Sequence, residues 1–180
     1  MTTLPFPPEL VAAAGGPLVR LVLGPDGRPS GAHAAIAVPA PLPRVWAVLA
    51  EIERLPERVP MVHRVSVDRD QVALQLRFKV SLLSATFGFA ARIIREEERL
   101  LELRWISGEP RGICLRNELV ALSGAPTPLT ILYHTVSFEM DSLGWLAKFF
   151  LRHHPEIRFG VFPGTALTML DAIRAAATRG

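Results

Sequence analysis

The chain contains very little cysteine, and it contains no long uninterrupted run of apolar residues. Cys114 is the single cysteine among 180 residues, which excludes a disulfide within the chain and is typical of proteins in a reducing cytoplasm. No stretch approaches the roughly 18 consecutive apolar residues that a membrane-spanning helix requires. The start, MTTLPFPPEL, lacks a basic region followed by an apolar core, so we expect no secretory signal. These absences favour a cytoplasmic protein that is soluble or at most peripheral.

Motifs of phosphate, metal and hydrolase chemistry are also missing. The sequence has no glycine-rich phosphate loop after a strand, no HExxH and no GxSxG. His153, His154 and Glu156 lie close together, but the side chains of adjacent residues diverge and the spacing fits no metal site. Cys114 falls on the predicted outer face of a strand without a positioned base, which indicates a structural thiol. We therefore expect no metal, no cofactor and no assigned catalytic residue.

Charge of one sign is not concentrated anywhere in the sequence. The formal net charge is +3, from 20 basic and 17 acidic residues, and the segment RIIREEER neutralises itself. Nucleic-acid binding needs a basic stripe, usually interleaved with aromatic residues, because phosphate contacts dominate its affinity. We therefore expect no nucleic acid among the partners.

Alternating apolar and polar residues, by contrast, fill the middle of the chain. In QVALQLRFKV, Val72, Leu74 and Leu76 alternate with polar residues, and SATFGFAARIIREEE, RLLELRWIS and GICLRNELVAL repeat the pattern. Such alternation predicts antiparallel strands with one buried face. Earlier strands are predicted near residues 32–38 and 62–68, and a last strand at 127–139, giving a sheet of about six to seven strands. The last strand is apolar on both faces, so either Tyr133 or His134 faces inward.

Helical patterns flank this meander. Residues 41–50 place apolar side chains on one face, and Pro56 and Pro60 limit the next helix to one or two turns. A helix over SLGWLAKFFLRHH is predicted to be capped by Asp141, and a longer one from about Pro163 carries an apolar stripe that includes Leu170. Only this last helix is long enough to cover the sheet, which predicts an α+β fold. We divide the chain into an N-terminal extension, 1–30, with a short helix and an added strand, and a ligand-binding domain, 31–180.

The segment AAIAVPAPLPRVWAVLAEIERLPERVPMVHRVSV resembles the SRPBCC superfamily, which includes START-type lipid carriers, polyketide cyclase/dehydrases and coenzyme-Q-binding proteins. The shared pattern is a strand, a proline, Val-Trp in a first helix, two further prolines and another strand. Leu55 stands where the superfamily often has an aromatic residue. The resemblance runs from about Ala32 to the C-terminus. It implies a helix-grip fold, in which a curved antiparallel sheet surrounds the C-terminal helix, two short helices close one end, and a cavity remains between sheet and helix.

Within that fold, the residues that the alternation directs inward are the predicted ligand-binding residues. They are Phe78, Phe87, Phe89, Trp105, Leu115, Asn117, Tyr133, Leu167 and Leu170. Two alternatives stay open: the aromatic residues could pack into a dry core, and Asn117 could hydrogen-bond to backbone instead of a ligand. His134 could act as a general acid or base, although a lone histidine on a strand is more often solvated or satisfied in place.

Three functions are compatible with these features. The first is binding or transport of a lipid, isoprenoid or polyketide in an internal cavity. The second is a polyketide cyclase or dehydratase, which is weakened because most strand arginines fall on the outer faces. The third is an interaction module with a vestigial cavity, in which outer residues such as Val136 and Phe138 contact a partner. We also predict a possible homodimer, and possible transient membrane-surface contact through Trp145, Phe149 and Phe150.

Overall fold

The computed structural model describes residues 4–80 and 83–179, with side chains except those of 78–80, 83–85 and 146. Its elements, in chain order, are α1 (Pro8–Ala13), β1 (Leu18–Leu23), β2 (Pro29–Val38), α2 (Leu42–Ala50), the 3-10 turn η1 (Ile52–Arg54), α3 (Leu55–Arg58), β3 (Val62–Asp68), β4 (Gln71–Val80), β5 (Leu83–Glu96), β6 (Leu100–Gly108), β7 (Cys114–Ala121), β8 (Thr130–Ser137), η2 (Met140–Ser142), α4 (Trp145–His153) and α5 (Ile157–Thr178).

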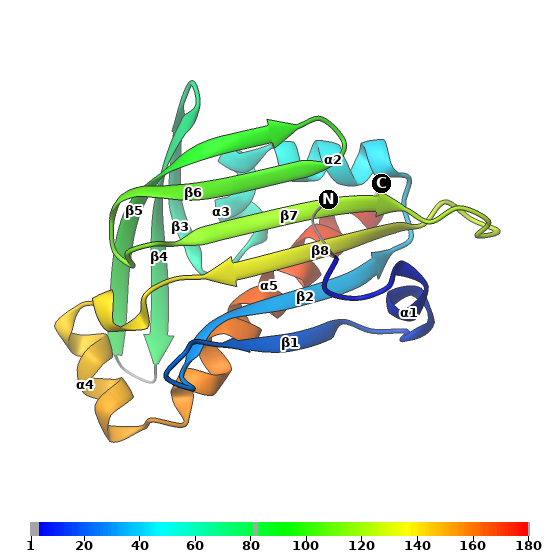
Figure 1. Ribbon diagram of the computed structural model, residues 1–180. Coiled ribbons are helices and arrows are strands. Elements are labelled where there is room, and N and C mark those ends of the chain that lie inside the picture. Colours follow the sequence, from blue (N-terminus) through cyan, green and yellow to red (C-terminus); the bar gives the residue numbers. More distant parts are fainter. Residues whose placement is uncertain (1–3, 81–82, 180) are drawn as a thin grey trace.

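The described strands form a single antiparallel sheet. Its order is β1-β2-β8-β7-β6-β5-β4-β3, so the chain runs as a meander from β3 to β8 and returns to the side of β2. This sheet has 8 strands, slightly more than the six to seven expected, and the predicted α+β helix-grip class is confirmed. Figure 1 shows β3, β4 and one end of β5 turned steeply away from the rest, which gives the sheet its curl.

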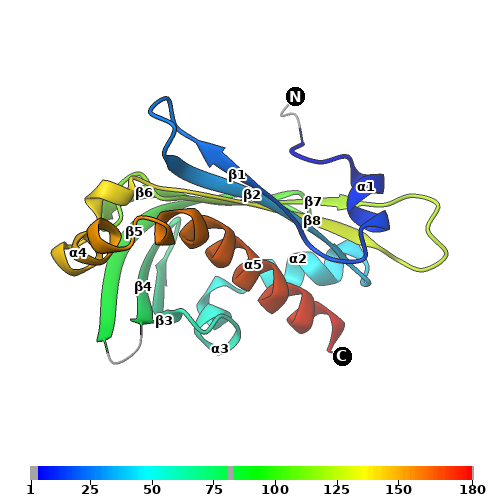
Figure 2. The same ribbon diagram turned by 90° about the horizontal axis from the view of Figure 1, so that it is seen from below.

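Helix α5 crosses the inner face of the sheet, and α1 lies on the opposite face (Figure 2). Phe162, Ala166, Leu170, Ile173 and Ala177 are buried between α5 and the sheet. They recur at intervals of three or four residues, which places them on one side of a helix. The long C-terminal helix therefore covers the apolar face, as the sequence predicts. None of the helices in the described ranges is long and apolar enough to cross a membrane.

The proline-rich segment after β2 forms the short helices that were predicted, with different boundaries. The first helix, α2, ends at Ala50, where Glu51 leaves helical geometry. Pro56 does not end it; this proline lies in the first turn of α3, where its missing N–H costs no hydrogen bond. Pro60 disfavours helical geometry at Val59, which is extended, and α3 therefore ends before β3 begins. Helix α2, the turn η1 and helix α3 together form a compact plug at one end of the sheet.

Two helix starts near the C-terminus differ from the prediction. Asp141 does not cap α4; it lies in η2, and Gly144 is the N-cap residue of α4. Helix α5 begins at Ile157 rather than near Pro163, and Pro163 lies inside it. Pro163 is the seventh residue of α5, so it removes one backbone donor from the second turn of the helix. The two extra turns bring Ile157 and Val161 to the cavity described below.

Candidate functional site: an apolar cavity under the C-terminal helix

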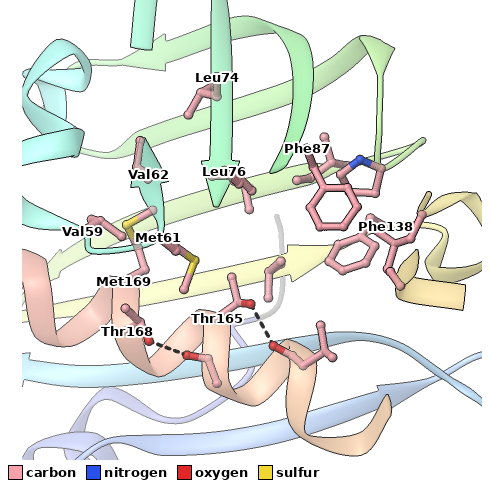
Figure 3. Close-up of a pocket in the computed structure, with 18 of the residues that line it drawn as sticks. Val59, Met61, Val62, Leu74, Leu76, Phe87, Phe138, Thr165, Thr168 and Met169 are labelled. Carbon is pink, nitrogen blue, oxygen red and sulfur yellow. Dashed lines mark hydrogen bonds between the residues drawn. The ribbon is translucent and has the colours of Figure 1, made fainter. Parts of the chain in front are cut away.

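A cavity of about 430 Å³ lies between the first half of α5, the curled strands β3 to β5 and helix α4 (Figure 3). Its volume is within the range of small-molecule sites, roughly 300–1,000 Å³. The lining residues are Val59, Met61, Val62, Leu74, Leu76, Phe87, Pro110, Ile113, Leu115, Val136, Phe138, Leu143, Ala147, Phe150, Leu151, Ile157, Val161, Gly164, Thr165, Thr168 and Met169.

Helix α5 presents a second stripe of residues to this cavity. Val161, Gly164, Thr165 and Thr168 are spaced by three, one and three residues and all line the cavity, so they share one face of the helix. Their side chains are small, and a Cβ added at Gly164 would meet no atom within 4 Å. Ile157 and Met169 line the cavity at the two ends of this stripe, and the smaller side chains between them leave the space between α5 and the curled strands open.

The cavity wall offers almost no polar group to a ligand. Only Thr165 and Thr168 carry side-chain hydroxyls among the described lining residues, and both donate to backbone carbonyls of their own helix: Thr165 Oγ1 to Val161 O and Thr168 Oγ1 to Gly164 O, each at 2.8 Å (Figure 3). No charged residue and no histidine lies among the described residues that line it. The wall therefore suits a hydrocarbon surface.

Two of the predicted ligand-binding residues, Phe87 and Leu115, line the cavity. Contact with a ligand stays a prediction for both. Phe78 lies outside the residues whose side chains are described. Four of the others face inward without lining the cavity: Phe89, Asn117 and Leu170 are buried, and Trp105 is half-buried. Leu167 is half-buried and belongs neither to the cavity lining nor to the core beneath α5.

Tyr133 requires a correction, because it lies on the opposite face of the sheet. It packs with Val11, Ala35 and Ile131 beneath α1, and its hydroxyl donates to Phe6 O at 3.0 Å. Burial raises the pKa of this tyrosine to about 12. Its role is thus to hold the N-terminal segment on the outer face, where it cannot contact a molecule in the cavity.

His134 is the inward residue of this pair, and it is completely buried. It lies opposite Asn117 on β7, and its Nδ1 is 2.8 Å from Asn117 Oδ1. Because Oδ1 can only accept, Nδ1 carries the proton, and Nε2 is left as a buried acceptor with no partner among the described residues. Burial lowers the pKa of His134 to about 4. Asn117 and His134 lie two residues along β7 and β8 from Leu115 and Val136, which line the cavity.

Several cavity residues were not predicted. Val136 and Phe138, which one hypothesis placed on an outer surface for a partner, both line the cavity, and so does Phe150, which was expected to face a membrane. Strand parity could have placed Val136, because it shares the face of Leu132 and His134. The contributions of Met61, Leu143 and Ala147 depend on how the plug and α4 fold over the cavity, and the sequence carried no signal for them.

The outer face of β6 and β7 carries the polar groups that the cavity lacks. Glu102 is almost fully buried there and accepts hydrogen bonds from Arg104 at 2.7 Å and from Arg116 at 2.9 Å. Burial, with the nearby Glu102 carboxylate, raises the pKa of the Cys114 thiol, which keeps it protonated and unreactive. These groups stabilise the outside of the sheet. No cluster of three or more potential metal ligands occurs among the described residues.

Comparison with known proteins identifies the family to which the chain belongs. Residues 38–155 match the family model described as polyketide cyclase / dehydrase and lipid transport. A search of curated proteins found no match. Similar solved structures include the Zhui aromatase/cyclase from Streptomyces sp. R1128, with 16% identity, a TM-score of 0.52 and coverage of 90% of this chain and 95% of that one.

Two further structures share the fold. A START superfamily protein from Mycobacterium smegmatis is 13% identical, with a TM-score of 0.55 and coverage of 82% of this chain and 97% of that one. A conserved protein from Geobacillus kaustophilus is 12% identical, with a TM-score of 0.59 and coverage of 83% and 95%. The resemblance to the SRPBCC superfamily is confirmed, and the chain belongs to the polyketide cyclase / dehydrase and lipid transport family.

Proposed function

We propose that the protein carries a hydrophobic small molecule, a lipid, isoprenoid or polyketide, in the cavity under α5 and releases it unchanged. The observation that carries this proposal is the wall itself: a space of about 430 Å³ lined by apolar side chains, whose two hydroxyls are already bonded within α5. Hydrophobic ligand binding agrees with both activities in the family description. The volume also favours a container over a module with a vestigial, filled cavity.

A cyclase or dehydratase is the second candidate, and one observation favours it. Such chemistry needs a group that donates or accepts a proton at the substrate. The described cavity wall has no titratable side chain, but His134, whose Nε2 has no partner among the described residues, lies two residues along β8 from the cavity-lining Val136. In the structure His134 is wholly buried, so a substrate would reach it only if the intervening side chains moved. The carrier reading therefore fits the observed geometry better.

Native mass spectrometry of the protein purified from cells tests the proposal directly. We expect a stoichiometric mass increment that disappears on organic extraction and is recovered as an unmodified hydrophobic molecule. Recovery of nothing from several expression hosts, together with no uptake of fatty acids or isoprenoid alcohols, would contradict carriage. Time-dependent conversion of an added polyketide chain would instead support the cyclase.

We also propose that α4 contacts anionic membrane surfaces. Its outer side exposes Trp145 at 78% and Phe149 at 52%, with Lys148 and Arg152 exposed on the same helix. Exposed aromatic side chains beside cations are typical of interfacial helices, which bind both the acyl boundary and anionic head groups. The inner side of α4 contributes Phe150 to the cavity wall. A homodimer stays a prediction, as does the cytoplasmic location suggested by the lone thiol.

Vesicle co-sedimentation distinguishes these possibilities. We expect the protein to pellet with vesicles of phosphatidylcholine and phosphatidylglycerol, more weakly with phosphatidylcholine alone. The double variant Trp145→Ser, Phe149→Ser should lose most of the binding, while Leu10→Ser, which removes an exposed leucine of α1 on the other side of the molecule, should not. Binding unaffected by the double variant would contradict the proposal. A concentration-dependent dimer that this variant dissociates would assign the surface to a second copy.

A further inference from the structure

The cavity has a polar neighbour at its α3 end. A depression in the surface is lined by Pro56, Pro60, Met61, Val62, His63, Arg77 and Thr168. Met61, Val62 and Thr168 also line the apolar cavity. The cavity and the depression therefore adjoin and share these three residues of their lining. In Figure 3 these residues gather around one end of the cavity, away from Phe87 and Phe138.

Arg77 and His63 are the polar groups of this depression. The Arg77 guanidinium donates from Nη2 to His63 Nε2 at 2.9 Å, and both residues are exposed. Their strands are fixed to each other at this point, because Arg77 N donates to Met61 O at 2.8 Å. Arg77 forms no ion pair with a carboxylate in the described part of the chain. A guanidinium has five N–H donors, so Arg77 keeps donors for an added anion.

An anionic end of a ligand, which can only accept hydrogen bonds, finds no free donor inside the cavity, since the Thr165 and Thr168 hydroxyls donate within α5 and the remaining described wall is apolar. An unpaired polar group buried there would cost about 1–3 kcal/mol. A molecule with one polar end is therefore most stable with that end outside the apolar wall. The depression beside Met61 and Thr168 is an adjoining place where a fixed cation is available.

We propose that the natural ligand of the cavity is an anionic amphiphile, whose apolar body fills the space under α5 and whose carboxylate or phosphate lies against Arg77 and His63. This inference rests on the proposed carrier function and specifies its ligand class. Arginine suits the site because its planar donor group matches the oxygens of carboxylate and phosphate. His63 accepts from Arg77 and holds the guanidinium at the edge of the depression.

Isothermal titration calorimetry with three probes of equal chain length tests the assignment: dodecanoate, dodecyl phosphate and dodecanol. We expect both anions to bind more tightly than the alcohol, with a preference that shrinks at high salt because the head group is solvent-exposed. Arg77→Gln should weaken the anions about fivefold, as for an exposed ion pair, and leave dodecanol unchanged. Whichever anion loses more affinity in this variant identifies the head group.

Arg92→Gln is the matched control, because Arg92 is an exposed arginine on the outer face of β5. It should leave the affinity for all three probes unchanged. Equal binding of anion and alcohol by the unmodified protein, or an equal response of Arg77→Gln and Arg92→Gln, would overturn the head-group site while leaving the carrier function intact. Absence of binding by all three probes would count against the carrier function itself. Thermal unfolding of each variant identifies any general loss of fold.

Discussion

Replacement of Thr165 by tryptophan is expected to weaken ligand binding about a hundredfold while the protein stays folded. Thr165 lines the cavity from the middle of α5, and its side chain points toward the open space (Figure 3). A tryptophan there occupies volume that the ligand needs. Excluding about four methylene groups, at about 0.8 kcal/mol each, removes about 3 kcal/mol of binding free energy, which is about two orders of magnitude in affinity. Dodecanoate titrated by calorimetry measures the effect.

Two further variants make this result specific. Asp171→Trp places the same side chain on an exposed position of α5 and should bind dodecanoate like the unmodified protein. Thr165→Leu fills less of the space and should lose an intermediate share of the affinity. This variant still tests the cavity if the tryptophan variant unfolds. Undiminished affinity in a folded Thr165→Trp protein would show that the ligand lies outside this cavity.

Acidification is expected to destabilise the fold through His134. Its folded-state pKa is about 4, below the ordinary value of 6.5, because burial disfavours the imidazolium. The unfolded chain therefore binds a proton at a higher pH than the folded chain does. The contribution of neutral His134 is complete above about pH 6.5 and is lost progressively as the pH falls toward 4, by about 3 kcal/mol in total. Urea unfolding measured at a series of pH values follows this loss.

His134→Gln isolates the contribution of this one residue. Glutamine does not titrate and can still bond the Asn117 amide, so the variant should lose less stability than the unmodified protein between pH 6.5 and 4. His153→Gln removes an exposed histidine on α4 and should keep the unmodified profile. Parallel pH profiles for the unmodified protein and His134→Gln would mean that His134 is hydrated or partnered in solution. In that case the cyclase candidate would gain support, since a reachable imidazole is what it lacks.

The strand pattern alone determined most of the architecture. Period-two alternation placed Leu74, Phe87, Leu103 and Leu115 on the inner face, and the structure buries all four there. This works because side chains on a strand alternate strictly, so a face follows from parity. The lone long apolar stripe at the C-terminus then left only one helix to cover the sheet. Parity failed at β8, where both faces are apolar: Tyr133 is covered by α1 and His134 by the inner layer, so neither face is wet.

The position of the cavity along the inner face depended on tertiary structure. Leu170 and Phe87 both face inward in the sequence pattern, yet Leu170 packs solidly while Phe87 borders open space. The difference arises because the sheet curls at β3 to β5 and α5 turns its small residues, Gly164 and Thr165, toward that end. The distance between α5 and the sheet depends on how the two surfaces pack against each other, which the pattern along either one alone does not give. Periodicity in the sequence therefore determined which faces are buried, whereas only the folded chain decided where burial leaves a cavity and which cation lines the adjoining depression.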